Sequence, residues 1–192
     1  MFKSRFWNIS LFFAITVTVY LMVKPGPVIT QAIAQAIAQD LNNKPLPEFT
    51  GKLDDWINSA PLTVNDLRGS VVLIDIWTFD CWNCYRSFPW MNDLEKRFSA
   101  KGLKVIGIHT PEFEHEKVKS NIETKMLKFK LQHPVMMDNN FTYWRALDNR
   151  YWPTFYVVDK QGMIRGRFIG ETHKGDKNAK AIENLIGRLL KE

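Results

Sequence analysis

The sequence predicts an α/β domain in which a central mixed β-sheet is flanked by helices. Apolar runs of strand length alternate with stretches of helical periodicity. The run 71–77 is almost continuously apolar, which is typical of a strand buried on both faces. Two later runs, 154–158 and 163–169, are separated by the turn sequence 159–162, which predicts an antiparallel pair.

The first half of the domain is expected to begin with a hairpin extension. Segments 49–56 and 62–67 are short and mixed in polarity, and we predict that they pair with each other. The strand 71–77 then leads into a helix at 84–98, whose apolar residues recur at helical spacing. Gly102 is expected to end that helix.

The second half continues the alternation of strands and helices. Apolar residues at 118, 122, 126 and 129 share one helical face, and the C-terminal stretch has a similar apolar face. We expect, in order, a strand at 103–109, a helix at 118–129, a short strand at 134–137, a helical turn at 141–147, the antiparallel pair, and a closing helix that begins at Asp176 or Asn178.

Composition and charge limit the function classes. The chain has 192 residues, 45% of them hydrophobic and 24% charged, which suits one globular domain with an N-terminal appendage. Of its 26 basic residues, Lys3, Arg5 and Lys24 precede the first acid, Asp40, which leaves 23 basic residues against 20 acidic ones beyond that point. These basic residues form no stripe with interleaved aromatics, so we expect no nucleic-acid partner.

The N-terminal part is predicted to lie outside the globular domain. Residues 1–23 are expected to form a membrane anchor or signal peptide, residues 24–46 a linker, and residues 47–192 the folded domain. Within the leader, 6–23 is an uncharged, mostly apolar run of 18 residues. A bilayer needs about 20 such residues, so the run is just long enough to span one.

The charges around this run predict its orientation. Lys3 and Arg5 precede it, so the N-terminus should stay cytoplasmic and the domain should be exported. A cleaved signal peptide is the alternative, because 32–34 and 36–38 are small-x-small sites, although they lie late for cleavage. In either case we expect the domain on the extracytoplasmic, periplasmic side of a bacterial inner membrane, where disulfides persist.

Cys81 and Cys84 are the only cysteines of the chain, and they lie between the apolar strand and the first helix. A helix N-terminus favours a thiolate over a thiol, so the position predicts redox chemistry. A structural zinc site needs about four ligands, and covalent haem attachment needs a histidine where Tyr85 stands. An inert disulfide closing so short a loop would stabilise little.

Several motifs in the same order resemble a known family. They are VVLIDIWTFDCWNC at 71–84, HTPEF at 109–113, NRYWP at 149–153 and VVDKQGMIR at 157–165. Over about 47–192 the chain resembles thioredoxin-fold proteins of the TlpA/ResA-like group and the C-terminal domain of DipZ. The resemblance implies a thioredoxin-like fold and an extracytoplasmic thiol–disulfide oxidoreductase, often membrane-anchored.

The resemblance implies four catalytic residues. Cys81 is expected to attack as the exposed thiol, and Cys84, one helical turn inward, to resolve the mixed disulfide. Asp75 lies inside the apolar strand, where a buried carboxylate has a raised pKa and can take the proton that Cys84 loses. Pro153 resembles the cis-proline that faces the dithiol in this fold.

Three tryptophans and two polar residues complete the predicted site. Trp77 and Trp82 are expected to form an apolar rim around Cys81 that binds substrate, although core packing explains Trp77 equally well. The backbone of Trp152 is expected to pair with an extended substrate segment. Asn83, which replaces the usual proline between the cysteines, and Glu112 are expected to tune the thiols, although a solvated loop acid explains Glu112 as well.

The resulting expectation is a reductase of exported proteins. A membrane electron donor would restore the dithiol, and the resemblance implies partners such as apocytochromes of cytochrome c biogenesis or other exported thiol proteins. We expect no cofactor beyond the redox-active disulfide and no metal. A disulfide-forming oxidant, a thiol peroxidase and a chaperone that binds Cu(I) on the two thiolates remain as alternatives.

Overall fold

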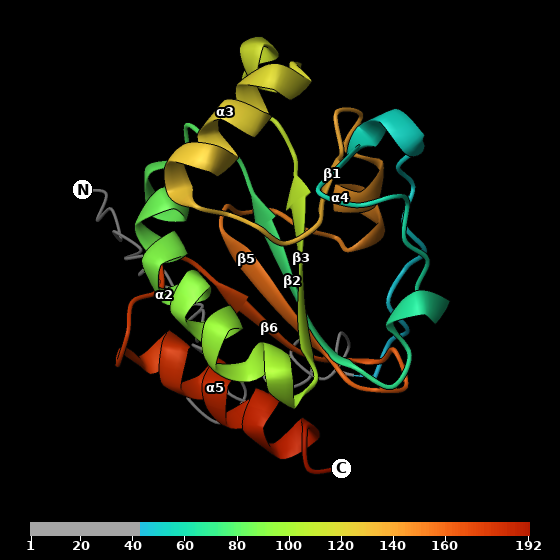
Figure 1. Cartoon of the computed structure of the whole chain (residues 1–192), viewed down its shortest axis with the longest axis vertical. Coiled ribbons are helices and arrows are strands. Elements are labelled where there is room, and N and C mark those ends of the chain that lie inside the picture. Colours follow the sequence, from blue (N-terminus) through green and yellow to red (C-terminus); the bar gives the residue numbers. More distant parts are fainter. Residues whose placement is uncertain (1–42) are drawn as a thin grey trace, which may run out of the picture.

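The structure is a computed structural model that describes residues 43–192, and a six-stranded sheet lies at its centre. The strands are β1 (Trp56–Ile57), β2 (Val71–Trp77), β3 (Leu103–His109), β4 (Val135–Met137), β5 (Thr154–Val158) and β6 (Ile164–Ile169). Their order across the sheet is β1-β4-β3-β2-β5-β6 (Figure 1). β2 and β3 run parallel, as do β3 and β4, whereas the other neighbours are antiparallel, which confirms the predicted mixed sheet.

Helices cover both faces of this sheet. They are α2 (Trp82–Phe98), α3 (Lys119–Phe129), α4 (Thr142–Ala146) and α5 (Lys177–Leu189). α2 and α5 lie side by side on one face (Figure 1), and the indole N–H of Trp90 on α2 donates to Glu183 on α5 at 2.9 Å. Gly102, with a φ of 102°, ends the 3-10 turn after α2, as expected for a residue that tolerates this left-handed conformation. The predicted alternation of elements after residue 70 is confirmed.

The strand β2 is buried on both faces, as its apolar run predicted, because all seven of its residues are buried. Successive side chains of a strand point to opposite faces. Leu73 and Trp77 therefore pack in one core with α2 and α5, whereas Ile74 and Ile76 pack in a second core with residues near α4. Asp75 shares the face of Leu73 and Trp77, so its carboxyl group points into the layer beneath α2.

The predicted N-terminal hairpin is wrong, because segments 49–56 and 62–67 do not pair with each other. β1 instead pairs with β4 at the edge of the sheet. Residues Asn65–Leu67 form a 3-10 turn, in which the Asp66 carboxylate accepts from the N–H of Thr63 at 2.8 Å and from its hydroxyl at 2.7 Å. These local bonds compete with a strand ladder and fix a turn.

The described chain begins with a short edge contact. The N–H of Asn43 donates to the carbonyl of Ile164, and the N–H of Leu46 donates to that of Gly162. Residues 43–46, assigned to the linker from the sequence, thus pair with the sheet edge, and Leu46 is buried. The predicted anchor at 6–23 lies outside the described residues. Among residues 43–192, no helix has the length and apolar character needed to cross a membrane.

Candidate active site

The two cysteines occupy the junction between β2 and α2, where they form a disulfide. Cys81 is the N-cap of α2, and the N–H of Cys84 donates to both its Sγ, at 3.2 Å, and its carbonyl, at 3.1 Å. Cys81 is half-buried, whereas Cys84 is completely buried. The helix N-terminus stabilises negative charge, so Cys81 is the sulfur that combines access with a site favouring a thiolate.

Asp75 is a buried carboxyl group beneath the dithiol helix. It is 1% exposed, and neither of its oxygens has a hydrogen-bond partner within residues 43–192. Desolvation raises its pKa from 3.8 to about 8, because the charged form has no compensating contact. The buried position expected from the sequence is confirmed, and proton exchange with Cys84 stays a prediction. Cys84 belongs to the same core as Leu73 and Trp77, which share the face of Asp75 on β2, so the carboxyl group faces the apolar layer that contains Cys84.

Trp152 and Pro153 precede β5, and the peptide bond between them is cis, as expected. Pro153 is buried, and Trp152 is half-buried. The indole N–H of Trp152 donates to the carbonyl of Thr110 at 3.0 Å, and its ring packs on Trp144 with centroids 4.4 Å apart. The predicted pairing of the Trp152 backbone with a substrate remains a prediction.

The other two tryptophans occupy opposite environments. Trp82 is 60% exposed at the start of α2, where its ring contacts Tyr85 and thus offers an apolar surface beside Cys81. Trp77 is 0% exposed and packs edge-to-face against Phe88 and His109, so its assignment to a substrate-binding rim is wrong. As the last residue of a strand buried on both faces, it belongs to the core.

Asn83 and Glu112, the two predicted tuning residues, are both exposed. The carbonyl of Asn83 accepts a hydrogen bond from the hydroxyl of Ser87 at 2.8 Å, within the first turn of α2. Glu112 contributes its backbone N–H, rather than its side chain, to the loop after β3. Tuning of the thiols by either side chain remains a prediction.

A third acidic residue, Glu116, was missed by the sequence reasoning. Its side chain is buried and accepts a hydrogen bond from the hydroxyl of Thr78 at 2.5 Å and from the N–H of Asp80, the residue before Cys81, at 3.0 Å. The segment around it is rich in charged residues, which usually marks a solvated loop. The only available signal was its position three residues after Phe113, where a side chain can cap the 3-10 turn Glu114–Lys117.

His109 lies next to this carboxylate but is not an acid–base group at neutral pH. Burial lowers its pKa to about 4, an effect that the charge of Glu116 partly offsets. Its Nε2 lies 3.3 Å from the hydroxyl of Thr78. The neutral ring is therefore part of the packing at the end of β3.

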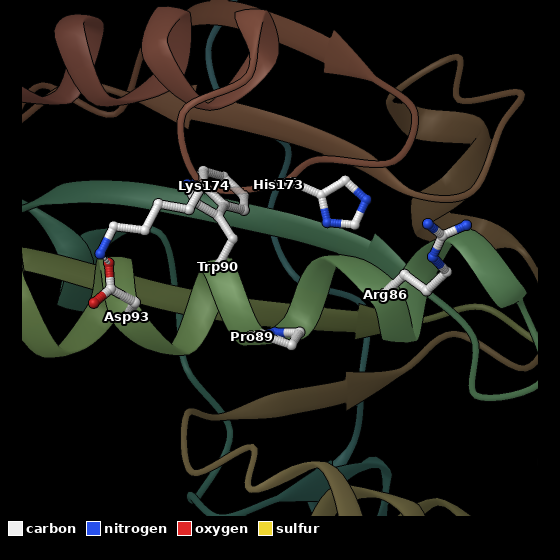
Figure 2. A pocket seen from close by; sticks show the side chains of 6 residues that line it. All are labelled: Arg86, Pro89, Trp90, Asp93, His173 and Lys174. Carbon is white, nitrogen blue, oxygen red and sulfur yellow. Dashed lines mark ion pairs between the residues drawn. The ribbon is translucent and has the colours of Figure 1, made fainter.

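A surface pocket of about 410 Å³ lies between α2 and the loop that precedes α5, and Figure 2 shows the side chains that line it. The residues that line it are Arg86, Pro89, Trp90, Asp93, His173 and Lys174. Its charges are paired: Arg86 contacts Glu171 at 3.1 Å, and Lys174 contacts Asp93 at 3.9 Å. Neither cysteine lines this pocket, so it does not form part of the reacting centre. No cluster of three or more metal-ligating side chains occurs within the described range 43–192.

Comparisons with known proteins agree with this geometry. The model of the AhpC/TSA family matches residues 43–167. Protein DipZ of Mycobacterium bovis is 37% identical over 149 residues, which cover 76% of this chain and 21% of DipZ. The thiol-disulfide oxidoreductase YkuV of Bacillus subtilis is 26% identical over 149 residues, which cover 78% of this chain and 96% of YkuV. The chain spans between 12% and 21% of the length of several other curated relatives that it matches.

Solved structures show the same architecture. The solution structure of a thioredoxin-like protein in the oxidized form superimposes with a TM-score of 0.66 at 27% sequence identity, over 79% of this chain and 97% of that one. The fold expected from the sequence motifs is thereby confirmed.

Proposed function

This chain belongs to the AhpC/TSA family, and we propose that it is a thioredoxin-like thiol–disulfide oxidoreductase that reduces the disulfides of exported proteins from a membrane anchor. The observation that carries the chemistry is the asymmetry of the dithiol. Cys81 is partly accessible at a helix N-terminus, whereas Cys84 is buried in the apolar layer that the unpaired carboxyl group of Asp75 faces.

The proposed cycle begins with the reduced protein. The Cys81 thiolate attacks one sulfur of a substrate disulfide, and the other substrate sulfur leaves as a thiolate and takes up a proton from water. The Cys84 thiol then loses its proton and attacks Cys81 Sγ. The Cys81–Cys84 disulfide forms, and the second substrate thiolate leaves and is protonated. Two electrons pass from the dithiol to the substrate.

Asp75 handles the proton of the buried sulfur in this proposal. In the ionised form it accepts the proton of Cys84 during resolution, which leaves the oxidised protein with a neutral carboxyl group. Its raised pKa of about 8 means that the oxidised protein holds this proton at neutral pH. When a donor dithiol reduces the disulfide again, Asp75 returns the proton to the Cys84 thiolate.

The proposed direction of electron flow and the proposed compartment rest on the leader and on the resemblance to TlpA/ResA-like proteins. The apolar run 6–23 would hold the domain at the periplasmic face of a bacterial inner membrane, within reach of a membrane electron donor. Apocytochromes and other exported thiol proteins are the proposed substrates. Exposed Trp82 supports a protein substrate, because it offers apolar contact area beside Cys81.

Trapping experiments test the order of attack and resolution. Cys84→Ser leaves Cys81 free to attack but removes the resolving thiol, so it should accumulate mixed disulfides with exported proteins in non-reducing gels. Cys81→Ser is the matched control and should trap none. If Cys81→Ser is the variant that traps, the assigned roles of the two cysteines are reversed.

The N-terminus of the mature protein tests the anchor. Membrane fractionation followed by N-terminal sequencing should find the protein in the membrane with the run 6–23 retained. A mature N-terminus after Ala34 or Ala38, in a protein released by washing, would contradict the anchor.

A further inference from the structure

The short segment that joins β2 to the dithiol is held from outside by the loop that follows β3. This segment, Thr78–Asp80, ends directly before Cys81, so its position determines where the attacking sulfur lies. Thr78 is completely buried. Its hydroxyl donates to Oε1 of Glu116 at 2.5 Å, and the N–H of Asp80 donates to the same oxygen at 3.0 Å.

The second oxygen of Glu116 is equally occupied. Oε2 accepts the N–H of Glu112 at 2.6 Å and the N–H of Phe113 at 2.8 Å. One completely buried carboxylate therefore joins two loops through four hydrogen bonds. Burial alone would raise the pKa of Glu116, but the bonds from Thr78, Phe113, Asp80 and Glu112 outweigh it, so its pKa lies below the ordinary value. Glu116 is thus ionised at neutral pH.

A set of side-chain contacts holds the same segment a second time. The carboxylate of Asp80 contacts Nε2 of His115 at 2.6 Å and Nζ of Lys125 at 3.1 Å. Lys125, on α3, also lies 4.7 Å from the ring centroid of Phe79. The ammonium group of Lys125 faces the Asp80 carboxylate and offsets its charge, which leaves Glu116 as the buried negative charge of this region.

We propose that Glu116 is a positioning residue of the dithiol, because its carboxylate fixes the Thr78–Asp80 segment and places a permanent negative charge at the backbone N–H of the residue before Cys81. A fixed charge of this sign opposes the Cys81 thiolate, which the N-terminus of α2 favours. A less stable thiolate makes the reduced dithiol less stable and the couple more reducing. The inference deepens the proposed reductase function and rests on it only for the identity of the reacting dithiol.

The two buried acids then have different tasks, set by their surroundings. Asp75 has no hydrogen-bond partner within residues 43–192, and its raised pKa lets it exchange a proton. Glu116 accepts four hydrogen bonds and stays charged, so it holds structure and contributes a constant field.

The variant Glu116→Gln tests this charge, with Glu114→Gln as the control. Glu114 lies on the same loop, but its side chain is 88% exposed. The measurements are the pKa of the Cys81 thiol, followed by thiolate absorbance, and the reduction potential of the couple, both on the full chain. For Glu116→Gln we expect a roughly tenfold shift toward thiolate, and a tenfold change in the redox equilibrium corresponds to about +30 mV. For Glu114→Gln solvent screening should keep both shifts far smaller.

A folded Glu116→Gln variant with the wild-type thiol pKa and potential would overturn the proposal, even if its melting temperature fell. Neither measurement needs a physiological substrate, so the proposed reductase function can fail while this inference stands, and the reverse also holds.

A second pair of variants covers the case in which Glu116→Gln does not fold. Thr78→Val removes the hydroxyl that donates to Glu116 with little change of shape, whereas Thr78→Ser keeps it. We expect Thr78→Val to slow alkylation of Cys81 by iodoacetamide severalfold and Thr78→Ser to restore the rate. Equal rates in both variants and the wild type would show that the carboxylate does not position Cys81.

Discussion

The buried carboxyl group of Asp75 predicts that the oxidised protein loses stability as the pH rises. The folded form keeps the proton up to its pKa of about 8, whereas the unfolded form releases it near 3.8. Between these values the unfolded state binds fewer protons, so the free energy of unfolding falls by about 1.4 kcal/mol per pH unit. The loss between pH 4 and pH 7 amounts to about 4 kcal/mol, and it ends above pH 8.

Asp75→Asn removes this ionisation without changing the size of the side chain. The free energy of unfolding of the oxidised variant, minus that of the oxidised wild type, should therefore rise by about 1.4 kcal/mol per unit from pH 5 to pH 7. Taking the difference cancels the titration of the other carboxylates. The same variant should resolve mixed disulfides more slowly, because Cys84 loses its proton acceptor.

Urea unfolding at pH 5, 6, 7 and 8 measures this difference, provided that the disulfide stays intact. Asp54→Asn serves as the control, because Asp54 is exposed and its replacement changes only the net charge. A difference between Asp75→Asn and wild type that stays constant from pH 5 to pH 8 would refute the reasoning, since Asp75 would then ionise as an ordinary surface acid.

Five further substitutions test the assignment of residues to core and surface. Trp77→Ala should lower the free energy of unfolding by about 3–5 kcal/mol in urea titrations, because it removes a buried ring. Trp82→Ala should change the free energy of unfolding by less than about 0.5 kcal/mol but slow the reduction of protein disulfides. Equal losses of stability in the two variants would contradict the buried and exposed environments of these residues. Gly107→Ala should lower the free energy of unfolding by about 1–3 kcal/mol in the same titration. The added Cβ would lie 2.8 Å from the indole nitrogen of Trp77 and 2.9 Å from a side-chain carbon of Val135. An unchanged unfolding midpoint would show that the surrounding side chains move away at no cost. Leu46→Ala should lower the free energy of unfolding by about 2–3 kcal/mol, because Leu46 is buried, whereas Leu127→Ala should have a near-zero effect, because Leu127 is exposed. A melting temperature lowered more by Leu127→Ala than by Leu46→Ala would show that residues 43–46 do not belong to the folded unit.

The sequence predicted those parts of the fold that depend on local patterns. The predicted bounds of β2 match those of the structure, because a short, nearly continuous apolar run is typical of a buried strand. The burial of Asp75 followed from its position inside that run. The helix after the dithiol and the turn 159–162 carried equally local signals. The segment 62–67 was mispredicted, because hydrogen bonds between Thr63 and Asp66 stabilise a turn where the mixed polarity of the segment had suggested a strand.

The rest of the site depends on contacts between segments distant in the sequence. Glu116 is buried because the loop after β3 folds against the segment before Cys81, and Asp80 in that segment is 36 residues away from Glu116 in the sequence. Periodicity cannot reveal such a contact, so Glu112 was the natural choice in the same loop. Trp77 was assigned to the rim for the same reason: the sequence places it near Cys81 but does not show that Phe88 and His109 cover it.

The equilibrium reduction potential of the Cys81–Cys84 couple tests the proposed reductase most directly. The purified full chain would be equilibrated with defined thiol–disulfide buffers, and the reduced fraction would be read from trapped thiols. A reductase supplied by a membrane donor predicts a potential near that of thioredoxin, about −270 mV. A potential near about −120 mV, which is typical of a strong disulfide oxidant, would contradict the proposal and assign the protein to disulfide formation.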